Sequence, residues 1–449
     1  MVVHPIEYRY GSSEMRSIFD IKNKIKLMIE VEIAILEALE ECHIIPKGVA
    51  EGVKNATTNL SIENVMHWEQ IVKHETMALV MAMTEVSGEF GKYIHLGATS
   101  NDILDTVMAI QIRDACNIIL RKLLNLIIIL MKLAWRERKT ACIGRTHGRA
   151  AIPTSFGYRI LQYVDELINA YKMLARAMKN AAVGKYSGAV GIYAELGKVM
   201  KEVEHLIMKR LGLGVAKYST QVVPRDRLST LMYTLILVST ILDHLGREIR
   251  NLQRSGIEEV YEPFGKHQVG SSVMPHKRNP ILSEKVCGLA KFLRGHIIGF
   301  LENIALEHER DLTNSSFERT ALPEVFLILD EQLETMNRVV ENLVVNRNNM
   351  INNIKQEGIY IYFDLLVQRI TLKGGNRQEA HHVLRELYLQ RASLEDVLSN
   401  EYIRKYLSED EILEAMNTDY YVNLAAWKVE ALIKEYCEEI GIRLDQVVS

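Results

Sequence analysis

Long stretches of this chain contain neither glycine nor proline, and this feature constrains the fold more than any other. The first such stretch runs from Ala98 to Ile143. Within it, apolar residues between Leu104 and Leu133 recur at a mean step of about 3.6 residues, which is the period of an α-helix. Because glycine and proline normally end helices, this window predicts one very long helix with an apolar stripe.

Two further windows contain no proline. The proline-free stretch from Arg225 to Glu262 carries an apolar stripe between Leu228 and Leu252. The mean step of this stripe is about 3.4 residues, close to the spacing of a left-handed helix bundle. A third window, from Glu324 to Glu357, is similar. A helix of about 38 residues would span roughly 57 Å, so such stripes are expected to pack against one another in an elongated bundle.

Alternating strand patterns are scarce, and an all-α fold is therefore predicted. We expect three helical domains, in which an elongated central long-helix bundle lies between two smaller helical segments. Their expected bounds are 1–95, 96–346 and 347–449.

Composition and charge exclude several classes of protein. Of the 449 residues, 48% are hydrophobic and 25% are charged, which excludes wholesale disorder. The formal net charge of -3 gives no reason to expect a nucleic-acid or anionic-membrane partner. The segment Met1–Arg16 has no apolar core of a signal peptide, and the most apolar stretch, Leu123–Leu133, is shorter than the ~18 residues of a membrane span. We therefore expect a soluble, cytoplasmic protein.

Four irregular, polar segments interrupt the helical pattern: His95–Asp102, Gly144–Gly148, Tyr218–Gln221 and Gly265–Pro280. The first is either a capped helix start or a place where free N–H groups bind a carboxylate. The second is a turn with one imidazole, which is more often structural than catalytic. The third, taken alone, is a capped loop. The fourth is either an exposed flexible loop or a lid that covers an anionic substrate.

Other catalytic templates are absent from the sequence. It contains no phosphate-binding loop, dinucleotide fingerprint, nucleophile elbow or zinc-protease motif. The five cysteines include no C-x-x-C pair, and the fourteen histidines are dispersed. Neither a disulfide framework nor a metal site is therefore indicated.

One segment carries a long and specific resemblance. Gly270–Pro280 resembles the signature G-S-S-x-M-P-x-K-x-N of the fumarase/aspartase superfamily, and Gly144–Gly148 and Gly97–Asp105 resemble its two other common segments. Within the superfamily, the chain is most similar to the adenylosuccinate lyase family. The segments that point to this family are Arg9–Tyr10, Lys73–Glu75, Lys185–Gly191, Thr220–Gln221, Arg225–Arg227 and Glu309–Arg319. Arg9 and Tyr10, which resemble a nucleotide-phosphate contact, favour this family over the argininosuccinate, fumarase and muconate branches.

The resemblance implies a carbon–nitrogen lyase of the amidine-lyase type. Such an enzyme eliminates fumarate from adenylosuccinate to give AMP, and from the related intermediate SAICAR to give AICAR, in purine nucleotide biosynthesis. The implied assembly is a homotetramer with a twenty-helix core, in which each active site is built from three subunits. Neither a metal nor an organic cofactor is implied, and neither nucleic acid nor membrane is an expected partner.

The resemblance also implies catalytic roles. Ser271 matches the general base, and His147 matches the general acid that protonates the departing nitrogen. Lys277 and Asn279 are expected to stabilise the doubly negative aci-carboxylate intermediate, and Glu284 to orient the imidazole. A serine hydroxyl is a poor base unless nearby positive charge and N–H donors lower its pKa.

The implied substrate-binding residues divide by the part of the substrate that they contact. The succinyl carboxylates are assigned to Thr99, Ser100 and Thr146, the orientation of the substrate to His74 and Gln221, and the nucleotide to Arg9, Tyr10, Arg310, Ser315 and Arg319. Two further residues assigned to substrate binding, Lys73 and Glu75, depart from the family pattern. Glu75 stands where the family usually has aspartate, and Lys73 where it often has arginine. The longer side chain of Glu75 bears on nucleotide positioning rather than on the chemistry.

Two alternatives remain open from the sequence. The first is a superfamily relative that acts on another succinyl-type substrate, such as argininosuccinate or a carboxymuconate. The second is a catalytically silent helical scaffold, as in crystallins related to this superfamily. The presence of Ser271, Lys277, Asn279 and His147 together argues against the scaffold.

Overall fold

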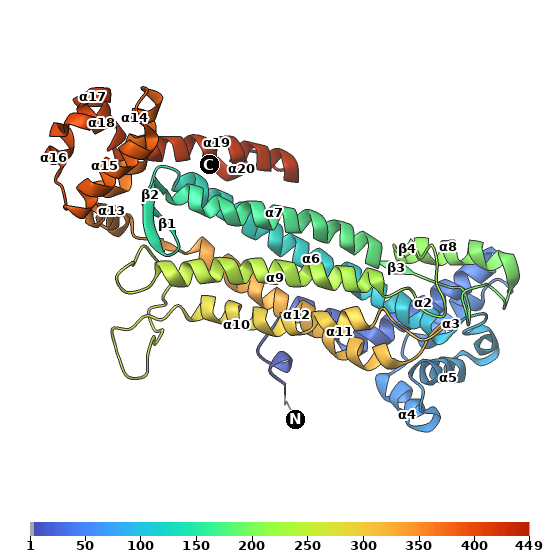
Figure 1. The fold of residues 1–449 in the computed structure, drawn as a ribbon. Coiled ribbons are helices and arrows are strands. Elements are labelled where there is room, and N and C mark those ends of the chain that lie inside the picture. Colours follow the sequence, from blue (N-terminus) through green and yellow to red (C-terminus); the bar gives the residue numbers. More distant parts are fainter. Residues whose placement is uncertain (1–3, 449) are drawn as a thin grey trace. The chain divides into compact units, whose positions relative to one another are not determined.

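The structure, a computed structural model, describes residues 4–448 and is built almost entirely of helices, which confirms the predicted all-α class (Figure 1). The N-terminal helices are α1 (Ser13–Phe19), α2 (Ile21–Glu41), α3 (Val49–Thr57), α4 (Ile62–Val72) and α5 (Glu75–Ser87). The middle of the chain forms α6 (Ser100–Arg136), α7 (Phe156–Ala181), α8 (Met200–Leu211), α9 (Asp226–Leu252), α10 (Ile281–Gly295), α11 (Ile297–Glu302) and α12 (Thr313–Glu341). The remaining α-helices are α13 (Arg347–Gln356), α14 (Phe363–Leu372), α15 (Arg377–Leu389), α16 (Leu394–Ser399), α17 (Glu401–Tyr406), α18 (Glu409–Ala415), α19 (Thr418–Ile440) and α20 (Asp445–Val448).

Short strands and 3-10 turns connect the helices. The strands form three two-stranded sheets: β1 (Ala141–Thr146) with β2 (Arg149–Ser155), antiparallel; β3 (Val183–Gly184) with β4 (Gly214–Val215), parallel; and β5 (Val260–Tyr261) with β6 (Val344–Val345), antiparallel. The 3-10 helices are η1 (Pro5–Glu7), η2 (Gly88–Tyr93), η3 (Gly197–Val199) and η4 (Gly358–Tyr362).

The chain divides into two compact units, each made of three segments. The first unit comprises Met1–Leu124, Asn169–Leu242 and Gly288–Glu334, and the second comprises Asn125–Ile168, Asp243–Cys287 and Thr335–Ser449. The helices α6, α7, α9, α10 and α12 contribute residues to both units. The predicted division into three consecutive domains stays a prediction.

The long helices agree in part with the first window, which lacks glycine and proline, and with the second, which lacks proline. Helix α6 ends at Arg136 although neither glycine nor proline follows before Gly144. It ends because Thr140 closes a turn on Glu137, donating its N–H to the Glu137 carbonyl at 3.0 Å and its hydroxyl to the Glu137 carboxylate at 2.7 Å. Helix α9 ends at Leu252, ahead of Gly256.

The prediction of one helix in the third window is wrong. Helix α12 starts ahead of it, at Thr313, and ends at Glu341, where the strand β6 separates it from α13. The side chain of Asn346 accepts a hydrogen bond from the N–H of Asn349 at 3.2 Å and so caps α13. An asparagine N-cap therefore restarts the helix without a glycine or proline.

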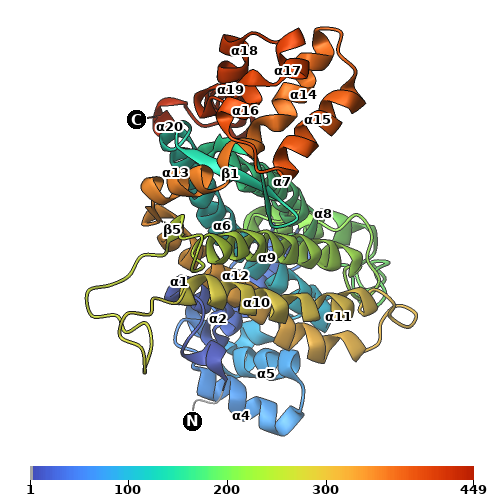
Figure 2. The ribbon, with the colours of Figure 1, turned by 60° about the vertical axis from the view of Figure 1, so that its left-hand side comes forward.

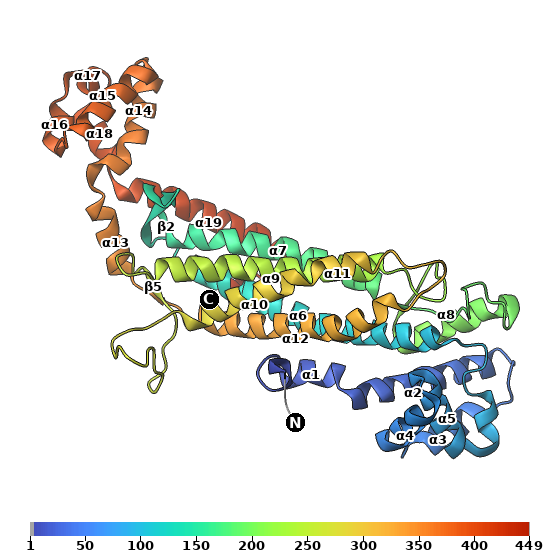
Figure 3. The same cartoon turned by 60° about the horizontal axis from the view of Figure 1, so that its bottom comes forward.

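The first unit has its main core where α2 packs against α3, α5 and α8 (Figure 3). Buried residues of α2 include Met28, Val31, Ile35 and Leu39, which follow the three- and four-residue spacing of one helix face. The buried carboxylate of Glu32 lies beside this core, with its Oε1 2.6 Å from Nδ1 of His95. This contact fixes the turn that leads into α6.

The second unit has its own core in the C-terminal helices. Figure 2 shows α14 to α18 gathered in one cluster. Their buried apolar side chains include Leu366, Ile370, Leu384 and Ile412. A second, smaller cluster joins Ile143 of β1 to residues of α13, η4 and α19. The hairpin β1–β2 is thereby attached to the helices of its own unit.

One helix satisfies the length and composition criteria of a membrane span. Helix α9 contains an 18-residue window with a mean hydropathy of 1.5, and 67% of that window is buried. The core helix of a soluble protein passes the same test, so this single helix is weak evidence for a membrane segment.

Candidate active site

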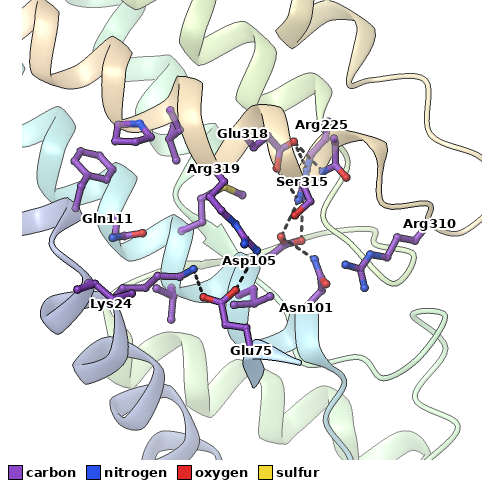
Figure 4. A pocket seen from close by; sticks show the side chains of 18 of the residues that line it. Lys24, Glu75, Asn101, Asp105, Gln111, Arg225, Arg310, Ser315, Glu318 and Arg319 are labelled. Atoms are coloured by element: carbon purple, nitrogen blue, oxygen red, sulfur yellow. Dashed lines mark hydrogen bonds and ion pairs between the residues drawn. The ribbon is translucent and has the colours of Figure 1, made fainter. Parts of the chain in front are cut away.

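The first unit contains a cavity of about 400 Å³ that collects charged and amide side chains from α2, α4, α5, α6 and α12, and from the segments just before α9 and α12 (Figure 4). Four residues that the resemblance assigned to substrate binding line this cavity: Glu75, Arg310, Ser315 and Arg319. The other assigned residues of this unit do not line it. They are Arg9, Tyr10, Lys73, His74, Thr99, Ser100 and Gln221.

A buried ion triad forms one wall of the cavity. The guanidinium of Arg225 donates to both carboxylate oxygens of Asp105, at 3.0 and 2.9 Å, and to both of Glu318, at 3.0 and 3.2 Å. Arg225 is only 5% exposed. Burial opposes its charge, but the two carboxylates outweigh burial and raise the pKa of Arg225 above its usual value. The triad fixes α6, α9 and α12 relative to one another around the cavity.

Replacing Arg225 with methionine is expected to lower the free energy of unfolding by about 3–5 kcal/mol, because two buried carboxylates lose their counter-charge. Equilibrium unfolding in urea measures the change. Arg227→Met is the matched control, since Arg227 is partly exposed and donates only to the carbonyl of Asn180, at 3.1 Å. Equal effects of the two substitutions would contradict a special role for the triad.

A second charged group lies across the cavity from the triad. One carboxylate oxygen of Glu75 contacts the ammonium of Lys24, and the other accepts a hydrogen bond from Arg319 at 3.2 Å. Arg310 points its guanidinium to the amide oxygen of Gln221, at 2.7 Å. Gln221 therefore contacts a residue of the cavity wall although it does not line the cavity itself.

The predicted helix start at the N-terminus of α6 is confirmed. The N–H of Thr99 donates to the carboxylate of Asp102 at 2.7 Å, and the N–H of Asp102 donates back to the Thr99 carbonyl at 2.9 Å. Asp102 is buried and also accepts from the backbone of Ser187 and contacts the ammonium of Lys185. Burial outweighs these contacts and raises the pKa of Asp102. Ser100 thus lies at the N-terminus of a 37-residue helix, where the macrodipole favours an anion.

His74 is the N-cap of α5. Its Nδ1 accepts a hydrogen bond from the N–H of Met77 at 3.3 Å, which makes Nε2 the protonated nitrogen. The side chain is exposed, so Nε2 is available to donate to a ligand. Lys73, the residue before it, ends α4 in a left-handed conformation with φ of 53°.

Arg9 and Tyr10 lie in the segment between η1 and α1. Arg16 fixes this segment, donating to the carbonyls of Glu7 at 2.5 Å, Tyr10 at 2.7 Å and Gly11 at 3.2 Å. Arg9 is exposed and Tyr10 is partly exposed. Both side chains are accessible from solvent.

In the second unit, His147 stands at the tip of the hairpin β1–β2. Thr146 and Arg149 pair across the hairpin, so the turn between them consists of His147 and Gly148. Both have positive φ, 53° and 74°, the pattern of a type I′ turn. The imidazole is exposed. The sequence analysis predicted the turn but not the strands that flank it.

A buried carboxylate fixes this hairpin from within its unit. Glu259 accepts from Arg145 at 2.6 and 3.1 Å, from Arg159 at 3.2 Å and from Asn353 at 2.9 Å. Burial alone would raise the pKa of Glu259, but the hydrogen bonds from Arg145 and Asn353 and the charges of both arginines outweigh it and lower the pKa. Since Arg145 is two residues from His147, Glu259 determines where the imidazole is presented.

Glu259→Gln is expected to lower the free energy of unfolding by about 3–5 kcal/mol at pH 7, because Arg145 loses its carboxylate partner and Arg159 keeps only Glu248, at 3.6 Å. A carboxylate with a lowered pKa in the folded state stabilises the fold above its unfolded pKa of about 4.3, and this stabilisation is lost as the pH falls through the folded pKa. The difference between wild type and Glu259→Gln should therefore be constant from about pH 5 to 8 and shrink below pH 4. Urea unfolding at several pH values measures it. The control is Glu258→Gln at the exposed neighbour, and a pH-independent difference would contradict the assignment.

The signature loop between β5 and α10 projects away from the helices that flank it (Figures 2 and 3). Within it, the hydroxyl oxygen of Ser271 accepts two backbone hydrogen bonds, from Val273 at 3.3 Å and from Met274 at 3.1 Å. Two N–H donors on one oxygen favour negative charge there. Asn279 donates its amide to the carbonyl of Gly270 at 3.1 Å, which closes the segment 270–279 of the loop.

The base of the loop borders a cavity of about 950 Å³ in the second unit. Of the residues assigned catalytic roles, Lys277, Asn279 and Glu284 line it. Its other charged lining residues are mainly cationic: Arg247, Arg250, Arg254 and Arg278, with Glu258. Such a surface is suited to an anion with several carboxylates.

Several assigned residues of the second unit are not brought into contact. Within residues 4–448, no hydrogen bond or ion pair joins His147 to Ser271 or to Glu284, and neither His147 nor Ser271 lines the larger cavity. The assigned residues are therefore distributed over the hairpin, the signature loop and the cavity of the first unit. No group of three or more histidine, cysteine, aspartate or glutamate side chains that could hold a metal ion occurs in the described part of the chain.

Comparison with known proteins identifies the family. A family model described as a lyase matches residues 7–295. The chain is 45% identical to the adenylosuccinate lyase of Pyrococcus horikoshii over 450 aligned residues, which cover 99% of this chain and 100% of that protein. It is 39% identical to the adenylosuccinate lyase of Methanothermobacter thermautotrophicus, with 97% of this chain and 99% of that protein covered. The chain belongs to the adenylosuccinate lyase family.

Solved structures of other enzymes of the fumarase/aspartase superfamily share the fold of this chain. The fumarate lyase from Mesorhizobium sp. BNC1 has a TM-score of 0.85 and 26% identity, covering 96% of this chain and 98% of that one. The 3-carboxy-cis,cis-muconate lactonizing enzyme from Pseudomonas putida has a TM-score of 0.86 and 25% identity, covering 97% and 99%. These neighbours have different names and one fold, so the fold does not identify the substrate.

The sequence analysis assigned no role to several residues that the cavity of the first unit collects. Asn101, Asp105, Arg225 and Glu318 lie in segments that the resemblance quoted, so their pattern was visible. Asn101 is buried, and its amide oxygen has no hydrogen-bond partner among the described residues although it lines the cavity. Lys24 and Gln111 carry no such signal, because a single lysine or glutamine on a helix is ordinary.

Proposed function

We propose that the protein eliminates fumarate from adenylosuccinate to give AMP, and from SAICAR to give AICAR, in purine nucleotide biosynthesis. It would act as a carbon–nitrogen lyase of the amidine-lyase type in the cytoplasm. The observation that carries this proposal is the full-length similarity to adenylosuccinate lyases at 39–45% identity. The cationic cavity of the second unit supports it, because the substrate carries several carboxylates.

In the proposed mechanism, Ser271 removes a proton from the succinyl carbon that is adjacent to the carbon bonded to the departing nitrogen. The electron pair of that bond moves onto the adjacent carboxylate and forms an aci-carboxylate. The two N–H donors on the Ser271 oxygen stabilise the ionised hydroxyl that this step requires. Lys277 and Asn279 donate to the dianion as it forms.

The second step breaks the carbon–nitrogen bond. The electron pair returns to form the double bond of fumarate, and His147 donates a proton to the departing nitrogen. Glu284 would orient the imidazole, and Thr99, Ser100 and Thr146 would bind the succinyl carboxylates. His74 and Gln221 would orient the substrate, and Arg9, Tyr10, Arg310, Ser315 and Arg319 would bind the nucleotide, near Lys73 and Glu75. Arginine suits the phosphate because its planar fork binds two oxygens.

The proposed assembly is a homotetramer in which three subunits build each site and the long helices form a twenty-helix core. The absence, within residues 4–448, of any hydrogen bond or ion pair that joins His147 to Ser271 or to Glu284 supports it. Metal ions, organic cofactors, nucleic acids and membranes have no part in the proposal.

A substrate panel tests the proposed function. Fumarate release is followed with adenylosuccinate, SAICAR, argininosuccinate and 3-carboxymuconate. Turnover of the first two is expected. Turnover of a carboxymuconate or of argininosuccinate without adenylosuccinate would overturn the proposal in favour of another superfamily activity.

A further inference from the structure

The cavity of the first unit contains as many carboxylates as cations. Its cations are Lys24, Arg225, Arg310 and Arg319, and its carboxylates are Glu69, Glu75, Asp105 and Glu318. A phosphate dianion is attracted to such a surface only if other groups of the cavity neutralise the carboxylates. The arrangement of the ion pairs therefore decides whether the cavity binds a phosphate.

Three of the carboxylates are accounted for without Lys24. Asp105 and Glu318 share the single positive charge of the buried Arg225, and each also accepts a hydrogen bond from an asparagine amide, from Asn101 at 3.2 Å and from Asn314 at 2.9 Å. Glu69 is exposed, so water screens its charge. Glu75 is different, because its side chain is only 23% exposed and contacts two cations, one on each oxygen.

The two cationic side chains that contact Glu75 differ in how freely they can move. The side chain of Arg319 is 65% exposed, whereas that of Lys24 is 25% exposed. Arg319 can therefore turn from Glu75 to a ligand, whereas Lys24 is confined beside the carboxylate. The chemistry fits this division, since the arginine fork suits a phosphate and a lysine ammonium acts as a compact point charge (Figure 4).

We propose that Lys24 is a positioning residue that neutralises Glu75 and thereby allows Arg319 to bind the phosphate of a nucleotide. This inference rests on the proposed function for the identity of the nucleotide. Without Lys24, Glu75 would retain Arg319 and would also repel the incoming phosphate. With Lys24, the carboxylate stays neutralised after Arg319 has turned away, and Arg319 and Arg310 remain as cations for the ligand.

A double-mutant cycle tests the inference. Lys24→Met is expected to raise KM for adenylosuccinate about tenfold and to change kcat by less than about twofold. In a Glu75→Gln background, where there is no charge to neutralise, Lys24→Met should raise KM by less than about twofold. Lys24→Arg keeps the charge and should keep KM near that of the wild type. The control is Lys26→Met, which removes a side chain that is 73% exposed on the same helix.

Binding of AMP by calorimetry separates this inference from the proposed function. The wild type is expected to bind AMP, and Lys24→Met is expected to raise the Kd for AMP in the native background but not in the Glu75→Gln background. This result would give Lys24 the inferred role even where no fumarate is released from adenylosuccinate. An equal rise of KM and Kd in both backgrounds would mean that Lys24 binds phosphate directly, and would overturn the inference. An unchanged Kd in a folded Lys24→Met protein, or no AMP binding by the wild type, would overturn it as well. Circular dichroism verifies that each variant is folded.

Discussion

Replacing Ser271 with alanine is expected to reduce fumarate release from adenylosuccinate by about 10²–10⁴-fold, which is the usual contribution of a proton-transfer group. The substitution removes the oxygen that accepts the N–H groups of Val273 and Met274. These two donors and the nearby cations of the loop are what would stabilise an ionised serine. Because Asn279 still closes the segment 270–279 through Gly270, the variant should fold and bind substrate as the wild type does.

The neighbouring serine provides the matched control. Ser272 is exposed and has no assigned role, so Ser272→Ala should change kcat by less than about twofold. This change is far smaller than the loss of about 10²–10⁴-fold expected for Ser271→Ala. Turnover with saturating substrate measures kcat, and calorimetry measures binding. If Ser271→Ala lost activity together with substrate binding or with its native oligomeric state, Ser271 would be structural rather than the base.

Most of the helical framework could be predicted because the hydrophobic period determines it. The apolar stripe that ends at Leu133 agrees with the end of α6 at Arg136, and the stripe that ends at Leu252 agrees with the end of α9. The absence of breakers was a poorer guide. The chain leaves the helix at Glu137 through side-chain hydrogen bonds, and it restarts one at Asn346 through an N-cap. Neither event needs glycine or proline.

The hairpin that carries His147 shows a second limit of sequence reasoning. Its turn was visible as a glycine-flanked segment, but its strands are short and contain Gly144 and Pro153. Gly144 is required because an added Cβ would lie 2.8 Å from the carbonyl oxygen of Ile152 across the hairpin. Tertiary contacts to α13 and α19 stabilise these strands, and no local pattern reports such contacts.

The candidate site was predictable only in part. The resemblance brought out residues of fixed motifs, and four of them line one cavity together. Arg225 was visible inside a quoted segment, but its burial between two carboxylates follows from the packing of three helices. Lys24 was invisible, because its significance depends on the position of Glu75, which is distant in the sequence. The role of a charged side chain such as Lys24 therefore depends on which residues it contacts in the fold.

Mixing two inactive variants should restore activity if the sites are shared between subunits. Ser271→Ala and His147→Gln are each expected to be inactive, since one lacks the base and the other the acid. In a mixed tetramer, a site that takes Ser271 from one chain and His147 from another is intact when both donors carry the native residue. Random assembly at equal amounts gives about a quarter of the sites this composition, so about a quarter of the wild-type activity should return.

The experiment depends on complete exchange of subunits. The two purified variants are mixed, dissociated in mild denaturant and reassembled by dialysis, and fumarate release is then measured against wild type treated in the same way. Each variant reassembled alone is the control and should stay inactive. Return of activity only after mixing would mean that His147 and Ser271 of one site come from different chains, as expected from the absence of a described contact between them within one chain. Full tetramer formation without any return of activity would instead place both residues of a site on the same chain.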